Sequence, residues 1–240
     1  MKILDDLIST LDSEAEVRDV RQGLFHTGVL TRQCGLAATL PRDVLRQKEP
    51  SVKQPGSLLE RSALELVRMA YSDTLLEAVI GMATINSLLN VDTANCRELN
   101  AGDLIQEKGE GRKVAIVGHF PFIQKLRKVA KELWVIEKNP REDDLEEAEA
   151  ERFIPEADIV GITGTSFTNH TIGHLLELCR PDAYIVILGD TTPLSPVLFD
   201  YGIHAISGTR VVDPDLALRC VSQGANYRQI RGIQKLTMMK

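Results

Sequence analysis

The segments KVAIVGHF (residues 113–120), ELWVIEK (132–138), ADIVGITGT (157–165) and DAYIVILGD (182–190) decide the fold class of this chain. Each contains a short, nearly continuous apolar run rich in Val and Ile, which is typical of strands buried on both faces of a parallel sheet. A segment that can form a helix follows each run, and strands alternating with helices indicate βαβ units. The sequence therefore predicts an α/β fold with a doubly wound, Rossmann-like parallel sheet.

The rest of this half extends the pattern. A shorter apolar run at residues 202–206 predicts a fifth strand, and residues 214–223 predict a closing helix. The polar, glycine-bearing segment LNAGDLIQEKGEGR at residues 99–112 is the expected linker. We therefore expect two domains, at residues 1–100 and 101–240.

The first hundred residues show a different pattern of apolar and polar residues. Apolar residues at helical spacing predict an amphipathic helix at residues 3–11, and glycine-punctuated runs at residues 17–40 predict two or three antiparallel strands. Apolar stripes predict helices over residues 57–71 and 73–89, the second with Asp73 as its N-cap. This half is predicted to be an α+β domain.

Composition excludes several classes of protein. Of the 240 residues, 43% are hydrophobic and 26% charged, which is ordinary for a chain that folds. The net charge of −6 gives no broad basic face, so nucleic acid is not an expected partner. No stretch approaches the roughly 20 apolar residues of a membrane helix, so we expect no membrane partner either. The acidic residues in the apolar start of the chain argue against a signal peptide.

The cysteines favour a reducing compartment. Cys34, Cys96, Cys179 and Cys220 are scattered without CxxC spacing, and we expect reduced thiols in a cytoplasmic protein. The sequence leaves open whether the protein forms a homo-oligomer.

Ligands of an open parallel sheet bind beyond the carboxyl ends of its strands, where the strand order reverses. Gly118, His119, Phe120 and Pro121 follow the first strand, and Pro121 suits a first helical turn whose free amides hold an anion. This is not the G-x-G-x-x-G of dinucleotide sites, so NAD is disfavoured. Glu137 ends the second strand, where a Rossmann acid meets a ribose hydroxyl, although a charged residue that merely closes a strand fits equally well.

The third strand end carries the most polar groups. Gly164, Thr165, Asn169 and Thr171 lie in the segment GTSFTNHT, where Thr168 or Asn169 is expected to cap the next helix and the free amides suit phosphate or carboxylate. A capped helix without a ligand is the alternative. Small and hydroxyl residues also follow the fourth strand from Gly189 and the fifth at residues 207–210, with Asp213 just beyond: the repetition favours a shared site at the strand ends.

Metal ligands are weaker candidates. His170, His174 and Glu177 share one helical face and could hold zinc, but a polar stripe opposite an apolar one is usually the solvated face. His119, at a strand end, is the better functional histidine, with a structural hydrogen bond as the alternative. Cys34 is either a cleft residue or a small buried hydrophobe, and Asn86, in an apolar helix stripe, needs a hydrogen-bond partner.

Five motifs in order resemble one known family. GHFPFI, WVIEKNP, ITGTSFTNHT, LGDTTPLSP and SGTRVVDP are similar to the family described as "putative heavy-metal chelation", formerly domain of unknown function 364. The helix with Asn86 and the GLA at residues 35–37 resemble the domain that accompanies it. The resemblance implies an N-terminal domain like that of enolase, a Rossmann-like C-terminal domain and a site in the cleft between them. Enolase chemistry is not implied, because its metal-binding carboxylates lie in a barrel that is absent here.

Carried over by position, the resemblance implies a set of ligand-binding residues and assigns no catalytic or metal-ligating ones. These are Gly118, His119, Phe120, Pro121, Glu137, Gly164, Thr165, Asn169, Thr171, Gly189 and Asp213.

The leading hypothesis is a cleft that binds a small anionic or metal-chelating molecule, with or without an enzymatic role in heavy-metal handling. The expected cofactor is a transition metal or a metal-chelate ligand: no concentrated set of metal ligands is evident, which favours a metal already held by its chelator, and direct coordination is the alternative. Two alternatives stay open: an enzyme using a nucleotide-containing cofactor such as S-adenosylmethionine, and a non-catalytic small-molecule-binding protein.

Overall fold

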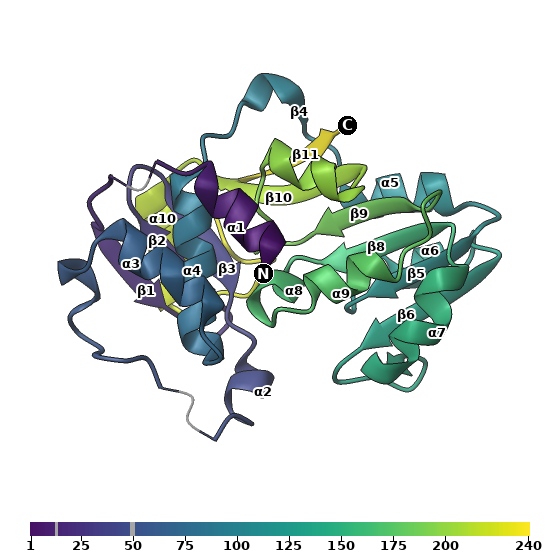
Figure 1. The fold of residues 1–240 in the computed structure, drawn as a ribbon, viewed down its shortest axis with the longest axis horizontal. Helices are drawn as coiled ribbons and strands as arrows, with labels where there is room; N and C mark the ends of the chain where they lie inside the picture. Colours follow the sequence, from purple (N-terminus) through teal and green to yellow (C-terminus); the bar gives the residue numbers. More distant parts are fainter. Residues whose placement is uncertain (13, 49–50) are drawn as a thin grey trace.

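The structure, a computed structural model, describes residues 1–12, 14–48 and 51–240. It is a mixed α/β fold with a large, mostly parallel sheet and a small antiparallel one (Figure 1). Within the described residues, no helix has both the length and the apolar character needed to cross a membrane.

The large sheet has eight strands in the order β4-β11-β10-β9-β8-β5-β6-β7. From β10 to β7 all neighbours are parallel, whereas β11 is antiparallel to both β10 and β4. The parallel part of the sheet begins at β5 in the middle, runs outward through β6 to β7, and continues on the other side of β5 with β8. The strands are β4 (Cys96–Arg97), β5 (Lys113–Val117), β6 (Glu132–Glu137), β7 (Leu145–Glu146), β8 (Ile159–Thr163), β9 (Tyr184–Leu188), β10 (Ala205–Val211) and β11 (Ile233–Met239).

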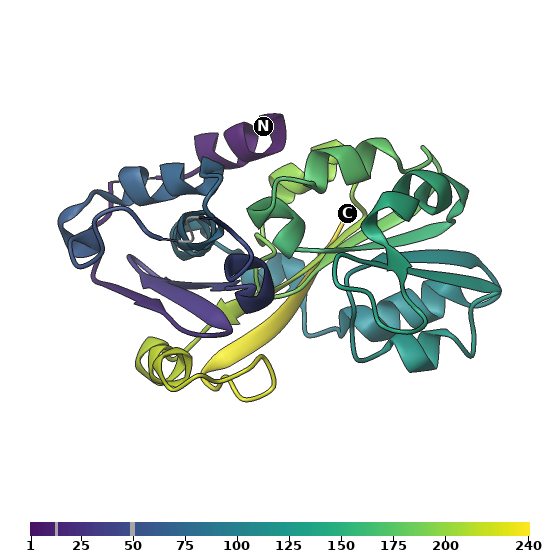
Figure 2. The ribbon, with the colours of Figure 1, turned by 90° about the horizontal axis from the view of Figure 1, so that it is seen from below.

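Helices cover both faces of this sheet (Figure 2). Leu104 and Ile105 of α5 and Leu126 of α6 pack with Ile116 on one face. Phe167 of α8 and Ile172 of α9 belong to the core on the other face. Both faces are therefore apolar, which explains why the strands read as continuous Val and Ile runs. The helices of this half are α5 (Ala101–Gly109), α6 (Ile123–Leu126), α7 (Ala150–Phe153), α8 (Thr165–Thr168), α9 (Ile172–Glu177) and α10 (Pro214–Ser222), with short 3₁₀ helices η3 (Thr93–Asn95), η4 (Glu147–Glu149), η5 (Ile154–Glu156) and η6 (Pro196–Tyr201).

The small sheet packs on one long helix. Its strands pair antiparallel in the order β1-β2-β3, which agrees with the strands expected at residues 17–40. Gly35 lets the backbone of β3 contact α4, since a Cβ there would lie 2.1 Å from the carbonyl oxygen of Ala83. The elements are α1 (Lys2–Ser9), β1 (Asp19–Gln22), β2 (His26–Leu30), β3 (Cys34–Ala38), α2 (Pro41–Val44), η1 (Leu58–Glu60), α3 (Ala63–Arg68), η2 (Met69–Tyr71) and α4 (Leu75–Leu88).

The prediction of a linker at residues 99–112 is wrong, because most of this segment forms helix α5. Asn100 caps this helix by accepting a hydrogen bond from the Gly102 amide. Leu104 and Ile105 are buried in the core of the large sheet. The apolar pair Leu104 and Ile105 therefore anchors α5 to the large sheet, although the rest of the segment is mostly polar.

Three further boundaries differ from the prediction. The helix expected at residues 57–71 is broken, and its α-helical part starts at Ala63 behind a capping box of Ser62 and Glu65. Asp73 is not an N-cap, because α4 starts at Leu75 with Thr74 at the cap position. The fifth strand runs over Ala205–Val211, so residues 207–210 lie within β10 and not after it.

The C-terminal segment also reaches the small sheet. Leu218 and Val221 of α10 pack with Cys34 and Leu36 of β3 in one buried cluster. Figure 1 shows α10 beside β1 and β2, far in the sequence from both. The division at residue 100 stays a prediction, and the two halves share this packed surface.

Candidate functional site

A cavity of about 220 Å³ lies where the strand order of the large sheet reverses. The arrowheads of β8 and β9 point toward the N-terminal elements (Figure 1). Residues at the carboxyl ends of β5, β6 and β8 line the cavity, and Leu40, Asp43 and Leu75 from the first half complete it. A second cavity of about 290 Å³ shares Leu40, Asp43, His119 and Glu137 with the first and adds Arg42 and Arg141. Such a reversal is where α/β sheets bind their ligands.

Gly118 makes the turn that opens the cavity after β5. Its φ of +101° is a conformation that a side chain rarely adopts, and a Cβ would lie 3.1 Å from Cβ of Thr163. Its amide donates to the Ile136 carbonyl, which ties the turn to β6. The glycine therefore holds the ends of three neighbouring strands close together.

His119 follows this turn and is oriented by a carboxylate. Its Nδ1 lies 2.9 Å from Oδ2 of Asp144, which also accepts the Arg141 amide at 3.1 Å. The Asp144 side chain is only 2% exposed, whereas that of His119 is 19% exposed and lines both cavities. The buried Asp144 carboxylate thus fixes the orientation of the His119 ring through Nδ1.

Glu137 ends β6 at the cavity wall. Within the described residues its carboxylate accepts one hydrogen bond, from the Asn139 amide at 3.3 Å. This leaves acceptor capacity for a ligand. The neighbouring Lys138 ammonium lies 3.5 Å from Oδ1 of Asp43, an ion pair that links the two halves at the cavity.

The end of β8 supplies hydroxyl groups. The hydroxyls of Thr163 and Thr165 lie 3.0 Å apart, and that of Ser166 donates to the Thr163 carbonyl. Asn169 accepts from both the amide and the hydroxyl of Thr171. The expectation that Thr168 or Asn169 caps the next helix is wrong, because Thr171 is at the N-cap position of α9 and makes no side-chain cap bond.

The cavity brings together seven of the eleven predicted site residues. They are Gly118, His119, Phe120, Glu137, Thr165, Asn169 and Thr171.

The other four lie outside the lining. Pro121 is exposed, and the helix it was expected to start begins two residues later at Ile123. Gly164 packs against Thr192, with Gly189 nearby. Asp213 caps α10 by accepting from the Leu216 amide and is exposed.

Sequence reasoning missed the contribution of the first half. Leu40 adopts a left-handed φ of +56°, uncommon for a residue with a branched side chain, and this turn brings Asp43 to the cavity. A strained residue at a cavity is a recognised mark of a functional site, but the sequence PRDV around Asp43 gave no signal. Asp144 was also missed, because it lies in an acidic stretch from Glu142 to Glu156, where no single carboxylate stands out in the sequence.

The proposed metal-ligating histidines are separated by the fold. His170 Nε2 lies 2.7 Å from the Ala70 carbonyl oxygen, and His174 lies on the exposed surface 3.7 Å from Glu151. In residues 1–12, 14–48 and 51–240 no group of three or more His, Cys, Asp or Glu side chains is placed to hold a metal ion.

Cys34 is a core residue. It packs with Leu36, Val211 and Leu218, and burial raises the pKa of its thiol to about 12. The interpretation as a small buried hydrophobe is therefore the correct one.

Asn86 has hydrogen-bond partners for its side-chain nitrogen, whereas its buried Oδ1 has none within the described residues. Its side-chain amide donates to the carbonyl oxygens of Leu36 and Thr191, which lie in different halves. Thr191 in turn accepts from the Ala38 amide. The LGDTT turn after β9 is therefore fastened to the small sheet and does not face the cavity.

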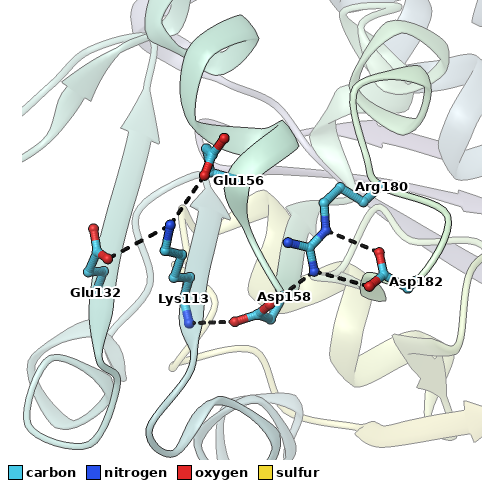
Figure 3. Close-up of polar contacts among 6 residues, drawn as sticks. All are labelled: Lys113, Glu132, Glu156, Asp158, Arg180 and Asp182. Atoms are coloured by element: carbon cyan, nitrogen blue, oxygen red, sulfur yellow. Dashed lines mark hydrogen bonds and ion pairs between the residues drawn. The ribbon is translucent and has the colours of Figure 1, made fainter.

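The amino ends of the strands carry a different kind of polar group. Figure 3 shows Asp158 accepting from the Lys113 amide and from Arg180, which also pairs with Asp182, while Lys113 pairs with Glu132 and Glu156. These side chains satisfy one another at the edge away from the cavity. We therefore interpret these side chains as structural, whereas the polar groups at the carboxyl ends of the strands can still form hydrogen bonds with a ligand.

Two family models match this chain, and both carry the description "Putative heavy-metal chelation". DUF364 matches residues 100–240, and DUF4213 matches residues 4–89. Among curated proteins, an uncharacterized protein of Methanocaldococcus jannaschii is 26% identical over 246 residues, covering 98% of this chain and 94% of its own.

Solved structures of the same family share the whole fold. A protein of unknown function from Desulfitobacterium hafniense has a TM-score of 0.87 at 28% identity and covers 100% of this chain and 98% of its own. One from Pyrococcus horikoshii has a TM-score of 0.85 at 23% identity, with the same coverage, and shows the fold alone.

Proposed function

This chain belongs to the DUF364 family, and from that premise we propose that the cavity between the two halves binds a small anionic or metal-chelating molecule. The observation that carries the proposal is the convergence of Gly118, Glu137 and Thr165, from three strand ends, on one cavity that the first half helps to close. A small molecule enclosed there would contact both halves at once.

The cavity offers complementary groups to such a ligand. The hydroxyl of Thr165 can donate to an anionic or carbonyl oxygen, and Arg42 and Arg141 line the adjoining outer cavity. Carboxylates of Asp43 and Glu137 can accept from hydroxyl or amino groups. A molecule with both kinds of group matches this lining better than a simple anion.

A heavy metal would enter this site as cargo inside its chelator. The described residues form no cluster of three metal-binding side chains, so the protein's contacts would be to the organic ligand. This keeps the family description and the lining of the cavity consistent with each other.

A nucleotide-containing cofactor such as S-adenosylmethionine is the second candidate. Glu137 favours it, because it ends the strand next to β5, where an acid of dinucleotide-binding folds meets the ribose hydroxyls. A non-catalytic sensor would use the same cavity and would show binding without turnover.

Native mass spectrometry of freshly purified protein separates these candidates. A retained metal chelate supports the leading proposal, and a retained adenosine compound supports the second. The variant Glu137→Ala should lose the retained mass. Glu132→Ala is the matched control, since Glu132 starts the same strand at the opposite edge of the sheet. Equal retention by both variants would contradict a site at Glu137.

A further inference from the structure

We propose that His119 is the proton acceptor of this cavity, with Asp144 as its positioning residue, and that it takes a proton from a hydroxyl or thiol of the bound ligand. This inference rests on the proposed function, because it needs a ligand in the cavity.

The hydrogen bond to Asp144 decides which ring nitrogen is available. An ionised carboxylate only accepts hydrogen bonds, so the contact of 2.9 Å places a proton on Nδ1 of His119. In the neutral ring, Nε2 then carries the lone pair. Within the described chain no hydrogen bond to Nε2 is present, and the ring lines both cavities. His119 therefore has its basic atom free for a ligand.

The surroundings of Asp144 hold its carboxylate in position to accept the hydrogen bond from Nδ1 of His119. Its side chain is almost fully buried, and the same Oδ2 accepts the Arg141 amide at 3.1 Å. A carboxylate fixed behind an imidazole orients the ring and stabilises the imidazolium that forms when Nε2 is protonated.

Where the chelator enters the cavity free of metal, proton transfer would prepare it for chelation. The O–H or S–H bond of the ligand breaks, an N–H bond forms at Nε2, and the electron pair stays on the oxygen or sulfur. The resulting anion is a stronger metal ligand than the neutral group. The ligand class is thus a chelator whose donor atoms carry an acidic proton, such as a hydroxamate, a catechol or a thiol.

Nitrogen NMR of protein labelled with ¹⁵N-histidine tests the arrangement without any ligand. Neutral His119 should show the Nδ1–H tautomer with a bare Nε2, and Asp144→Ala should lose this preference while Asp144→Glu keeps it. Glu147→Gln is the matched control, since Glu147 lines the same cavity without bonding to His119, and it should leave the tautomer unchanged. Wild-type protein with its neutral proton on Nε2 would overturn the inference, even if the Asp144 variants failed to fold.

Titration with acetohydroxamate then tests the transfer. Calorimetry in buffers of different ionisation enthalpy reports binding, and the His119 ¹⁵N shifts report protonation. Binding that protonates His119 supports the inference, and binding that leaves its Nε2 bare overturns it. Absence of binding by acetohydroxamate, catechol and a simple thiol would instead overturn this ligand class. Failure of every chelate and nucleotide to bind would overturn the proposed function, whatever the tautomer.

Discussion

Nε2 of His26 lies 2.8 Å from Oδ2 of Asp190, which connects the small antiparallel sheet to the turn after β9 of the large sheet. Both side chains are only 5% exposed, and Thr209 donates to the other Asp190 oxygen at 2.8 Å. Burial and then the charge of Asp190 raise the pKa of Tyr227. This buried polar contact fixes how the two halves meet and so shapes the cavity between them.

Replacing His26 by Ala should destabilise the fold strongly. The substitution leaves the Asp190 carboxylate buried without its partner, which costs about 3 kcal/mol or more in the free energy of unfolding. Urea denaturation measures this loss. The control is His174→Ala, since the His174 side chain is 56% exposed, and its effect should be within roughly 0.5 kcal/mol. Similar losses in both variants would show that the buried contact is unimportant.

Substitution by Ala should lower the stability of the fold at Gly35 and raise it at Gly173. A Cβ at Gly35 would lie 2.1 Å from the Ala83 carbonyl oxygen and 2.3 Å from the Ser87 amide nitrogen, so β3 must move off α4. The expected destabilisation is about 1–3 kcal/mol. Gly173 is helical with nothing near its Cβ position, and Ala there should stabilise by about 0.4–1 kcal/mol. Thermal unfolding distinguishes the two, and a tolerated Gly35→Ala would contradict the backbone contact.

The contribution of Asp158 should depend on pH. Its pKa is lowered from the ordinary 3.8, first by the hydrogen bond from the Lys113 amide and further by Arg180. A lowered pKa in the folded state adds stability above the unfolded pKa and loses it as the pH falls through the folded pKa. The wild-type advantage over Asp158→Ala, about 1 kcal/mol, should therefore be constant near neutral pH and decrease once the pH falls below the ordinary 3.8 and through the lowered folded pKa.

Unfolding of both proteins between about pH 2 and 7 checks this. Asp182→Ala is the control, since its carboxylate pairs with the same Arg180 but is 76% exposed, and its effect should be smaller. A wild-type advantage that grows on acidification would contradict the assignment.

The centre of the large sheet was predictable, and its edges were not. Runs such as Val114 to Val117 are apolar on both faces, which singles them out as buried parallel strands. β11 escaped notice because Gln234 and Lys235 interrupt its pattern, and its pairing with β10 depends on a distant segment. Helix α5 was missed because only Leu104 and Ile105 reveal its buried face.

The site was predictable only where it follows the strands. Gly118, Glu137 and Thr165 are marked by their positions after apolar runs, and strand ends in a parallel sheet lie at one edge. Asp43 and Asp144 come from segments whose approach depends on tertiary packing, so local sequence carries no sign of it. The same limit applies to His26 and Asp190, which are 164 residues apart.

Calorimetric titration with a panel of metal chelates, free chelators, bare metal ions and S-adenosylmethionine tests the central claim, that the cavity holds a small molecule at Glu137. We predict that at least one chelate or nucleotide binds, with an affinity at least about tenfold weaker in Glu137→Ala, a loss of about 1.4 kcal/mol. The control Glu132→Ala should bind like the wild type. Binding by no member of the panel, or equal binding by both variants, would contradict the account.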